Sequence, residues 1–183
     1  IVVPFAIECA LSGVEKHITK DDRLWYRKSF TLPESFKGKR TLLHFGAVDW
    51  ECKVYVNKTQ VGSHIGGYCP FTLDITDALC DGENELVVWV YDPTDEAWQN
   101  RGKQASYSHG FWYTSTSGIW QTVWLEAVSE SYIGGYRLTP DIDEGVLNIE
   151  TSVIGEGSLK IKVLDGDTVV AEKEIAAKDK VEI

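Results

Sequence analysis

The side chains best suited to chemistry are gathered in one long connection, residues 93–112, between two runs of strand character. Loops of more than about 12–15 residues without regular structure are uncommon in compact domains and are often functional. This loop sets aromatic rings beside amides and charges, which suits a carbohydrate, because a sugar offers a C–H face for stacking and hydroxyls for hydrogen bonds. The predicted sugar-binding side chains of the loop are Trp98, Gln99, Arg101, Lys103 and Trp112. The alternative is that the aromatic residues only pin the loop to the domain, with Arg101 and Lys103 solvated or ion-paired.

A second candidate is Asp49, in the segment Phe45–Glu51. A strand that ends in Gly46 and is followed by Asp49 can present this carboxylate at the mouth of a sandwich. Carboxylates accept hydrogen bonds from sugar hydroxyls at both oxygens, so Asp49 is predicted to bind substrate. The alternative is that Asp49 caps a turn and Trp50 belongs to the core.

Catalysis by this chain alone is not predicted. Glycoside hydrolysis needs two facing carboxylates, about 5–5.5 Å apart for retention or about 6.5–9.5 Å apart for inversion. Most of the 28 Asp and Glu residues flank turns or face solvent on alternating strands, and such positions do not pair a raised pKa with a second ionised group. The chain also contains no Gly-x-Ser-x-Gly elbow and no phosphate-cradling glycine loop. No catalytic residue is therefore assigned.

No metal site or cofactor is predicted. The histidines show no His-x-x-x-His spacing, and the cysteines show no Cys-x-x-Cys spacing. Free, buried thiols are favoured for the cysteines because Cys is among the most buried residue types, and one or two disulfides remain the alternative. The residues concerned are His17, His44, His64 and His109, and Cys9, Cys52, Cys69 and Cys80.

Composition restricts the class of protein. The 183 residues are 43% hydrophobic and 25% charged, with a net charge of -10, which is ordinary for a globular protein of one or two domains. A sequence pI of about 4.8 without a basic cluster argues against a nucleic-acid partner, which requires concentrated Lys and Arg. Apolar runs reach only strand length, so no membrane span is predicted.

Short β-branched and aromatic runs separated by turn residues indicate strands in the first part of the chain. One short helical turn is predicted around residues 74–79. Without long 3.6-period stripes, this spacing predicts an all-β jelly-roll sandwich instead of alternating strands and helices. The predicted strands are 24–32, 40–46, 52–57, 71–75, 85–92 and 119–128.

A composition break near residue 130 predicts a second domain. Every Trp, Phe and Tyr lies at or before Tyr136. Beyond it, alternating runs at 146–153, 159–164 and 168–175 are joined by glycine-containing turns. We predict a jelly-roll domain over 1–130 and an incomplete immunoglobulin-like sandwich over 131–183, because such a sandwich takes about 100 residues.

Several blocks in order resemble the N-terminal sugar-binding jelly roll of family-2 glycoside hydrolases, the family of β-galactosidases, β-glucuronidases and β-mannosidases. The resemblance covers nearly all of residues 1–130, and the chain from about Tyr132 is similar to the start of the immunoglobulin-like domain that follows in that family. The matching blocks are Leu24–Pro33, Leu43–Trp50, Val54–Asn57, Gly66–Tyr68, Pro70–Thr76, Gly82–Leu86 and Gly118–Glu126.

The resemblance implies a parent enzyme with a catalytic Glu pair on a TIM barrel outside this sequence, acting by a retaining double displacement. In the β-galactosidase branch, the first domain contributes an Asn to the sugar subsite at the position that Asp49 matches. That branch also carries an acidic contributor shortly before the Ser-Gly-Ile motif. Here residues 111–116 contain no acid, so neither this role nor its metal is transferred. Residues 99–104 resemble a subgroup of β-galactosidase-like proteins.

The resulting prediction is a non-catalytic N-terminal fragment of a β-galactosidase-like retaining β-glycosidase, which scaffolds the barrel and lends loops to the sugar site. The expected partners are a β-galactoside or related glycan and the TIM barrel of the same chain, and a homo-oligomer is left open. Analogy favours a periplasmic or secreted location. The alternatives are a stand-alone carbohydrate-binding module and a purely structural or oligomerisation domain. Because Ile1 is not Met and 180–183 has strand character, the sequence is expected to be part of a longer chain.

Overall fold

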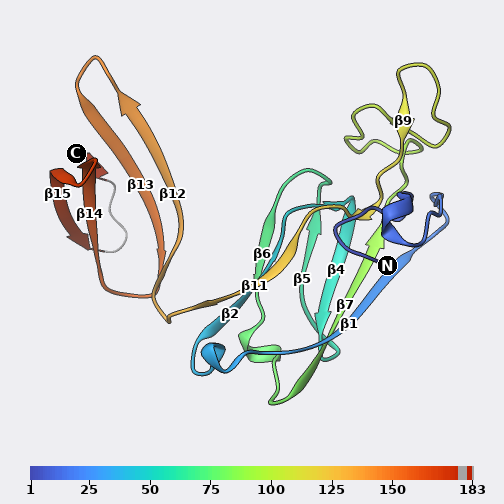
Figure 1. The fold of residues 1–183 in the computed structure, drawn as a ribbon, viewed down its shortest axis with the longest axis horizontal. Helices are drawn as coiled ribbons and strands as arrows, with labels where there is room; N and C mark the ends of the chain where they lie inside the picture. The colour runs from blue at the N-terminus through green and yellow to red at the C-terminus, as the bar shows by residue number, and fades with distance from the viewer. Residues whose placement is uncertain (177–180, 183) are drawn as a thin grey trace. The chain divides into compact units, whose positions relative to one another are not determined.

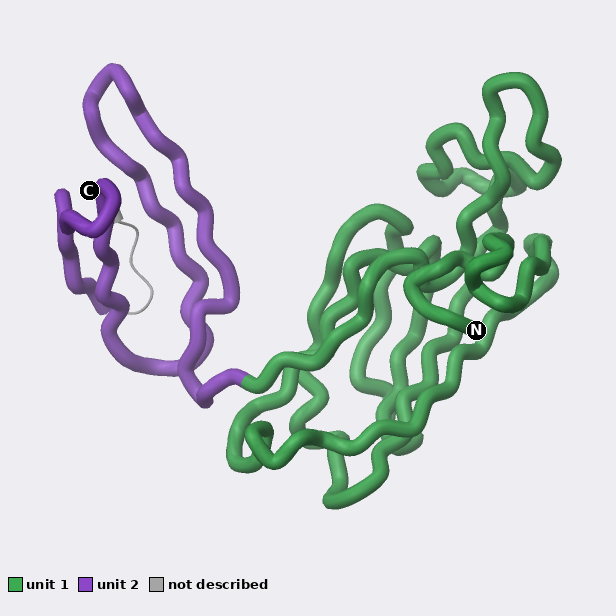
Figure 2. The backbone as a smooth tube through the Cα atoms, in the orientation of Figure 1, with its two compact units in different colours: residues 1–127 green, residues 128–183 purple. Residues whose placement is uncertain are grey.

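The computed structural model describes residues 1–176 and 181–182. The chain forms two compact units, Ile1–Ala127 and Val128–Ile183, which are coloured separately in Figure 2. Strands are the main regular structure of each unit, and the helical segments in the described residues are single 3-10 turns. These turns are η1 (Ala10–Ser12), η2 (Glu34–Phe36) and η3 (Thr76–Ala78).

Unit 1 is a sandwich of two sheets (Figure 1). One sheet has the strand order β1-β7-β4-β5 and the other has the order β11-β2-β6. β1 pairs with β7, β4 pairs with both β5 and β7, and β2 pairs with β6, all in antiparallel orientation. The strands are β1 (Leu24–Thr31), β2 (Arg40–Phe45), β4 (Glu51–Val56), β5 (Thr59–Ile65), β6 (Phe71–Asp74), β7 (Glu83–Tyr91) and β11 (Val123–Val128).

The core of unit 1 lies between the two sheets. In β4 the residues Cys52, Val54 and Val56 are fully buried and alternate with half-buried neighbours, as expected for a strand with one face inward. From the opposite sheet, Phe45 is also fully buried and stacks on Phe71 at 4.8 Å between ring centres. Burial of these apolar faces is the main force that holds the sandwich together.

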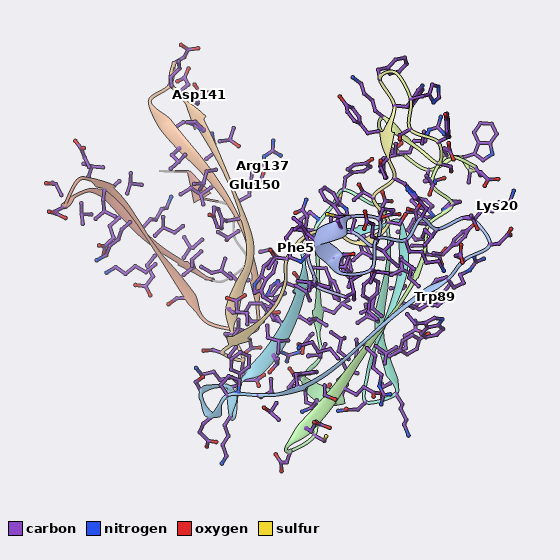
Figure 3. All side chains as sticks on the ribbon, turned by 45° about the vertical axis from the view of Figure 1, so that its right-hand side comes forward. Phe5, Lys20, Trp89, Arg137, Asp141 and Glu150 are labelled. Carbon is purple, nitrogen blue, oxygen red and sulfur yellow. The ribbon has the colours of Figure 1, made fainter. Side chains whose placement is uncertain are left out.

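The outer face of the four-stranded sheet is polar and aromatic. Trp89 of β7 stands away from the strands (Figure 3), and Lys53 Nζ lies 4.8 Å from the centre of its ring. Trp25 is paired with Trp89 in the register of β1 and β7 and is 64% exposed. This alternation of apolar inward and amphipathic outward residues fixes the register of the sheet.

One end of the sandwich carries short strand pairs that hold the connecting loops. β3 (Val48–Asp49) pairs with β10 (Gly118–Ile119). β8 (Gln104–Ala105) pairs with β9 (Tyr113–Thr114) in parallel. The segment around β9 extends beyond this end of the sandwich in Figure 1. Residues far apart in the sequence therefore meet where β3 and β10 are joined.

Unit 2 consists of hairpin-linked strands. β12 (Tyr132–Asp141) pairs with β13 (Val146–Ile154), which pairs with β16 (Val181–Glu182). β14 (Ser158–Asp165) pairs with β15 (Thr168–Ala176). Arg137 and Glu150 are partners in the β12–β13 register and lie beside each other in Figure 3.

The all-β prediction is confirmed, and each strand predicted in unit 1 overlaps an observed one, with the last broken into β10 and β11. The expected helical turn is the 3-10 turn η3. Two longer strands, β5 and β12, were not predicted, because polar residues and glycines interrupt both runs. The two-residue strands β3, β8 and β9 were not predicted either. All four cysteines are free thiols, but burial is complete only at Cys52, while Cys69 and Cys80 are exposed.

Candidate functional site

Asp49 lies at the loop-bearing end of unit 1, where β3 pairs with β10. It is the partner of Gly118 in this pair, and only 3% of its surface is exposed. Gln104 Nε2 donates to Asp49 Oδ2 at 3.1 Å and to the Tyr68 hydroxyl at 3.2 Å. The other oxygen, Asp49 Oδ1, is buried without a hydrogen-bond partner. A buried carboxylate oxygen with unused acceptor capacity is rare in native proteins and calls for an explanation, such as a bound water or another polar group.

The backbone at Gly67 packs directly against the Asp49 carboxyl group. A Cβ atom at this position would collide with Asp49 Oδ1. The Gly67 carbonyl accepts a hydrogen bond from Trp120 Nε1 at 2.8 Å. Glycine is therefore required at position 67 for steric reasons, and the contact fixes one side of the carboxyl group.

Two further carboxyl groups are buried near Asp49. The hydroxyl of Ser117 donates to Asp92 Oδ2 at 2.5 Å, and its backbone N–H donates to Glu8 Oε2 at 3.1 Å. The Ser115 hydroxyl donates to Glu8 Oε1 at 3.4 Å. Ser117 therefore joins a carboxyl group of the N-terminal segment to one at the end of β7.

Burial governs the protonation of this cluster. Burial, reinforced by the negative charge of Asp92, raises the pKa of Asp49 to about 7. Burial also raises the pKa values of Asp92 and Glu8. Removing a carboxylate from water and placing it near like charges both disfavour the ionised form. Near neutral pH, Asp49 therefore exists in both forms and can accept or donate a hydrogen bond.

The five predicted loop residues have different environments in the structure. Trp98 is fully exposed. Gln99 folds back, with Nε2 donating to the Thr94 carbonyl at 2.7 Å and Oε1 buried without a partner. Lys103 is exposed on its side chain, and its carbonyl accepts a hydrogen bond from the Tyr113 N–H at 2.8 Å.

Arg101 and Trp112 form a contact of their own. Arg101 Nη1 donates to the Asp95 carbonyl at 2.9 Å and lies 3.7 Å from Asp95 Oδ2. The Arg101 guanidinium lies 5.2 Å from the centre of the Trp112 ring, within the range of a cation–π interaction. Arg101 is therefore ion-paired, which agrees with the alternative given for this residue in the sequence analysis. The loop side chain that bonds to Asp49 is Gln104, which was not among the predicted site residues.

Sequence reasoning missed the residues that surround Asp49. Gln104 lies at the end of the segment 99–104, whose resemblance was noted, and Gly67 and Tyr68 lie in a matching block. Those blocks were the available signal for all three. Glu8 and Asp92 gave no local signal, because their meeting at Ser117 depends on the fold.

The site has no features of a metal centre. Across the described part of the chain, no group of three or more His, Cys, Asp or Glu side chains could hold a metal ion. The same described residues also contain no helix that is long and apolar enough to cross a membrane. What the arrangement offers is hydrogen bonding to a neutral polar group.

Comparison with known proteins identifies the protein family of this chain. Residues 4–128 match the family described as glycosyl hydrolases family 2, sugar binding domain. The chain belongs to this family.

Among characterised relatives, the β-galactosidase of Thermoanaerobacter pseudethanolicus is 32% identical over 153 residues, which are 80% of this chain and 20% of that protein. The β-galactosidase BoGH2A of Bacteroides ovatus is 33% identical over 72% of this chain and 15% of its own length. The β-glucuronidase of Paenibacillus borealis is 27% identical over 90% of this chain and 31% of its own length. The chain thus spans between about a seventh and a third of these relatives.

The fold is shared with solved structures. The β-glucuronidase of Bifidobacterium dentium, complexed with coumarin-3-O-glucuronide, superposes with a TM-score of 0.75 at 24% identity and covers all of this chain, which spans 36% of that protein. A β-glucuronidase of Ruminococcus gnavus in complex with a C6-substituted uronic isofagomine gives a TM-score of 0.72 at 20% identity. This likeness confirms the β-sandwich fold.

Proposed function

We propose that this chain is the non-catalytic N-terminal part of a retaining β-glycosidase of β-galactosidase type. In this proposal it scaffolds a TIM barrel that lies outside the sequence and contributes Asp49 to the sugar site. Trp98, Gln99, Arg101, Lys103 and Trp112 belong to the loop that borders this site. The carbohydrate substrate is a β-galactoside or a related glycan.

The observation that carries the proposal is the unused, buried oxygen of Asp49. A buried carboxylate oxygen without a partner is costly, so a donor that reached Oδ1 when a sugar and the rest of the enzyme assemble around it would be stabilising. Gln104 and Gly67 hold the carboxyl group in a fixed orientation, so little ordering is needed when a sugar binds. Family membership, together with relatives named β-galactosidase and β-glucuronidase that extend far beyond this chain, supports a composite site.

One alternative has a specific observation in its favour. Trp98, Tyr107 and Phe111 are strongly exposed on the loop, and exposed aromatic rings are the usual surface of an independent carbohydrate-binding module. A purely structural domain would need neither the exposed rings nor the unused carboxylate oxygen.

The test is substitution of Asp49 in the full-length enzyme. Asp49→Ala is expected to lower kcat/KM on an aryl β-galactoside by about 10²-fold, because the loss of a hydrogen bond to a charged or partly charged group costs about 1.5–3 kcal/mol. Asp49→Asn keeps the shape and is expected to retain more activity. Asp81→Asn, at an exposed turn, is the matched control and should leave kcat/KM unchanged.

Two results would contradict the proposal. Unchanged kcat/KM in Asp49→Ala would leave the domain a structural role only. Tight sugar binding by the 183-residue chain that depends on Trp98 and not on Asp49 would favour the independent binding module.

A further inference from the structure

A hollow lies next to the Asp49 site. Its volume is about 580 Å³, within the range of small-molecule sites. It borders the Asp49 site at Tyr68, whose hydroxyl shares the Gln104 side chain with Asp49. The residues that line it are Pro4, Gly46, Tyr68, Pro70, Trp120, Gln121, Thr122 and Trp124.

The Trp124 ring is held rigidly although it is 45% exposed. It stacks on His44, with ring centres 4.7 Å apart and an angle of 11° between the planes. Both nitrogens of His44 are engaged, Nδ1 with Thr72 Oγ1 at 2.8 Å and Nε2 with Glu126 Oε2 at 3.0 Å. One face of the exposed Trp124 ring is therefore covered by the fixed imidazole ring of His44.

The other two rings of the hollow are also fixed. Tyr68 meets Trp120 edge to face at 6.2 Å. Trp120 is anchored by its hydrogen bond to the Gly67 carbonyl, and Tyr68 by its bond with Gln104. Tyr68 remains 46% exposed. Ordered aromatic surface left in contact with water is costly, and it is typical of recognition sites that are preformed.

The chemistry of the lining selects the ligand. Aromatic and proline rings provide apolar faces, while Gln121 and Thr122 add neutral donors and acceptors at the surface. Every residue of this lining is uncharged at neutral pH. A carboxylate or phosphate would find no cation to pair with here, whereas the C–H face and hydroxyls of a neutral pyranose match both kinds of surface.

We propose that this hollow is a second sugar subsite, which binds a neutral pyranose unit of an oligosaccharide through the platform of Trp124, Tyr68 and Trp120. The inference deepens the proposed function, on which it rests for the role of the subsite: it makes the natural substrate an extended glycan. Binding at the hollow itself does not require Asp49.

The experiment measures binding of neutral oligosaccharides to the 183-residue chain by calorimetry and tryptophan fluorescence, using β-1,4-galactotriose, cellotriose and xylotriose as probes. We expect saturable binding of at least one of them. Trp124→Ala is expected to weaken it about tenfold, the effect of losing one aromatic platform. Trp25→Ala is the matched control, since Trp25 is an exposed tryptophan on β1 outside the hollow, and it should leave the affinity unchanged.

A second, milder variant tests the hollow in case Trp124→Ala fails to fold. Gln121→Ala removes an exposed side chain and is expected to weaken binding two- to fivefold, with an unchanged circular dichroism spectrum. Asp81→Asn, at an exposed position outside the hollow, should leave this binding unchanged. In the full-length enzyme, Trp124→Ala should lower kcat/KM on the trisaccharide but not on an aryl β-galactoside, which distinguishes this inference from the effect of Asp49.

Three results would overturn the subsite. They are flat titrations with all the neutral probes, equal effects of Trp124→Ala and Trp25→Ala, and Trp124-dependent binding of a proline-rich peptide in place of sugars. A proline-rich peptide is included because grooves lined by aromatic side chains also bind such peptides.

Discussion

The two units of the chain differ in how they use buried space. In unit 1 a continuous apolar cluster fills the sandwich, and every polar side chain found buried in the described residues lies in this unit. Among the described residues of unit 2, Ile149 is the one hydrophobic side chain that is buried, and Ile133, Leu138 and Ile142 are more than half exposed.

This difference shows what a buried carboxyl group requires. Asp49, Asp92 and Glu8 lose hydration only because a thick apolar core and the surrounding loops exclude water from them. A sheet that leaves its apolar side chains in water cannot raise a pKa by burial. The candidate chemistry is therefore confined to unit 1, while unit 2 carries exposed apolar faces typical of incomplete packing.

The largest expected effect comes from the cores themselves. Phe45→Ala in unit 1 should lower the free energy of unfolding by about 3–5 kcal/mol, because it opens a cavity among residues that cannot collapse into it. Ile149→Ala in unit 2 should cost about 2 kcal/mol, the lower end of the range for a buried Ile, since few buried neighbours surround it. Urea denaturation of both variants measures the contrast, with Phe111→Ala, at an exposed ring, as the control. Equal losses in the two units would contradict it.

A smaller effect should follow from the buried carboxyl group. Because the folded-state pKa of Asp49 is about 7, above its ordinary value of 3.8, the native state holds a proton that the unfolded chain releases. Stability is thus lost as pH rises between about 4 and 7, and the loss is complete above that window. Asp49→Asn carries no such proton, so its stability relative to the native sequence should improve by about 2 kcal/mol between pH 5 and pH 8.

Urea denaturation of the Asp49→Asn variant and the native chain at the two pH values tests this prediction. Asp92 and Glu8 contribute to the pH dependence of stability in both proteins, so their contributions largely cancel in the difference between the two free energies of unfolding. Asp81→Asn serves as the exposed control, and its stability relative to the native chain should be the same at both pH values. A constant difference between Asp49→Asn and the native chain would mean that Asp49 ionises as it does in water.

The smallest predicted effect concerns the contact between Gly67 and Asp49. Gly67→Ala should destabilise the chain by about 1–2 kcal/mol, because the new methyl group collides with the Asp49 carboxyl group. In an Asp49→Ala background the same change should cost much less. The double-mutant cycle, measured by thermal unfolding, gives the coupling directly. Additive losses at the two positions would show that they do not touch.

How far the sequence predicted the site differs from residue to residue. Asp49 was predicted because it follows a strand end and matches a position of the family, and the structure gives it a distinctive environment. The loop was predicted from its length and composition, but which of its side chains approaches Asp49 was not. Gln104 has the same local character as Gln99, and only the pairing of β8 with β9 places the former toward Asp49 while the latter turns back to Thr94.

The sequence by itself determined the strand character, the change of composition near residue 130 and the family, because alternation, turn residues and motif order are local properties of the chain. The tertiary structure decided which carboxyl groups share a buried space, which ring is supported by His44, and why position 67 must be glycine. Those properties depend on contacts between residues that are distant in sequence, as with Asp49 and Gln104 or Glu8 and Ser117. Burial and long-range contacts, which set pKa values and preform binding surfaces, exist only after the sheets have packed.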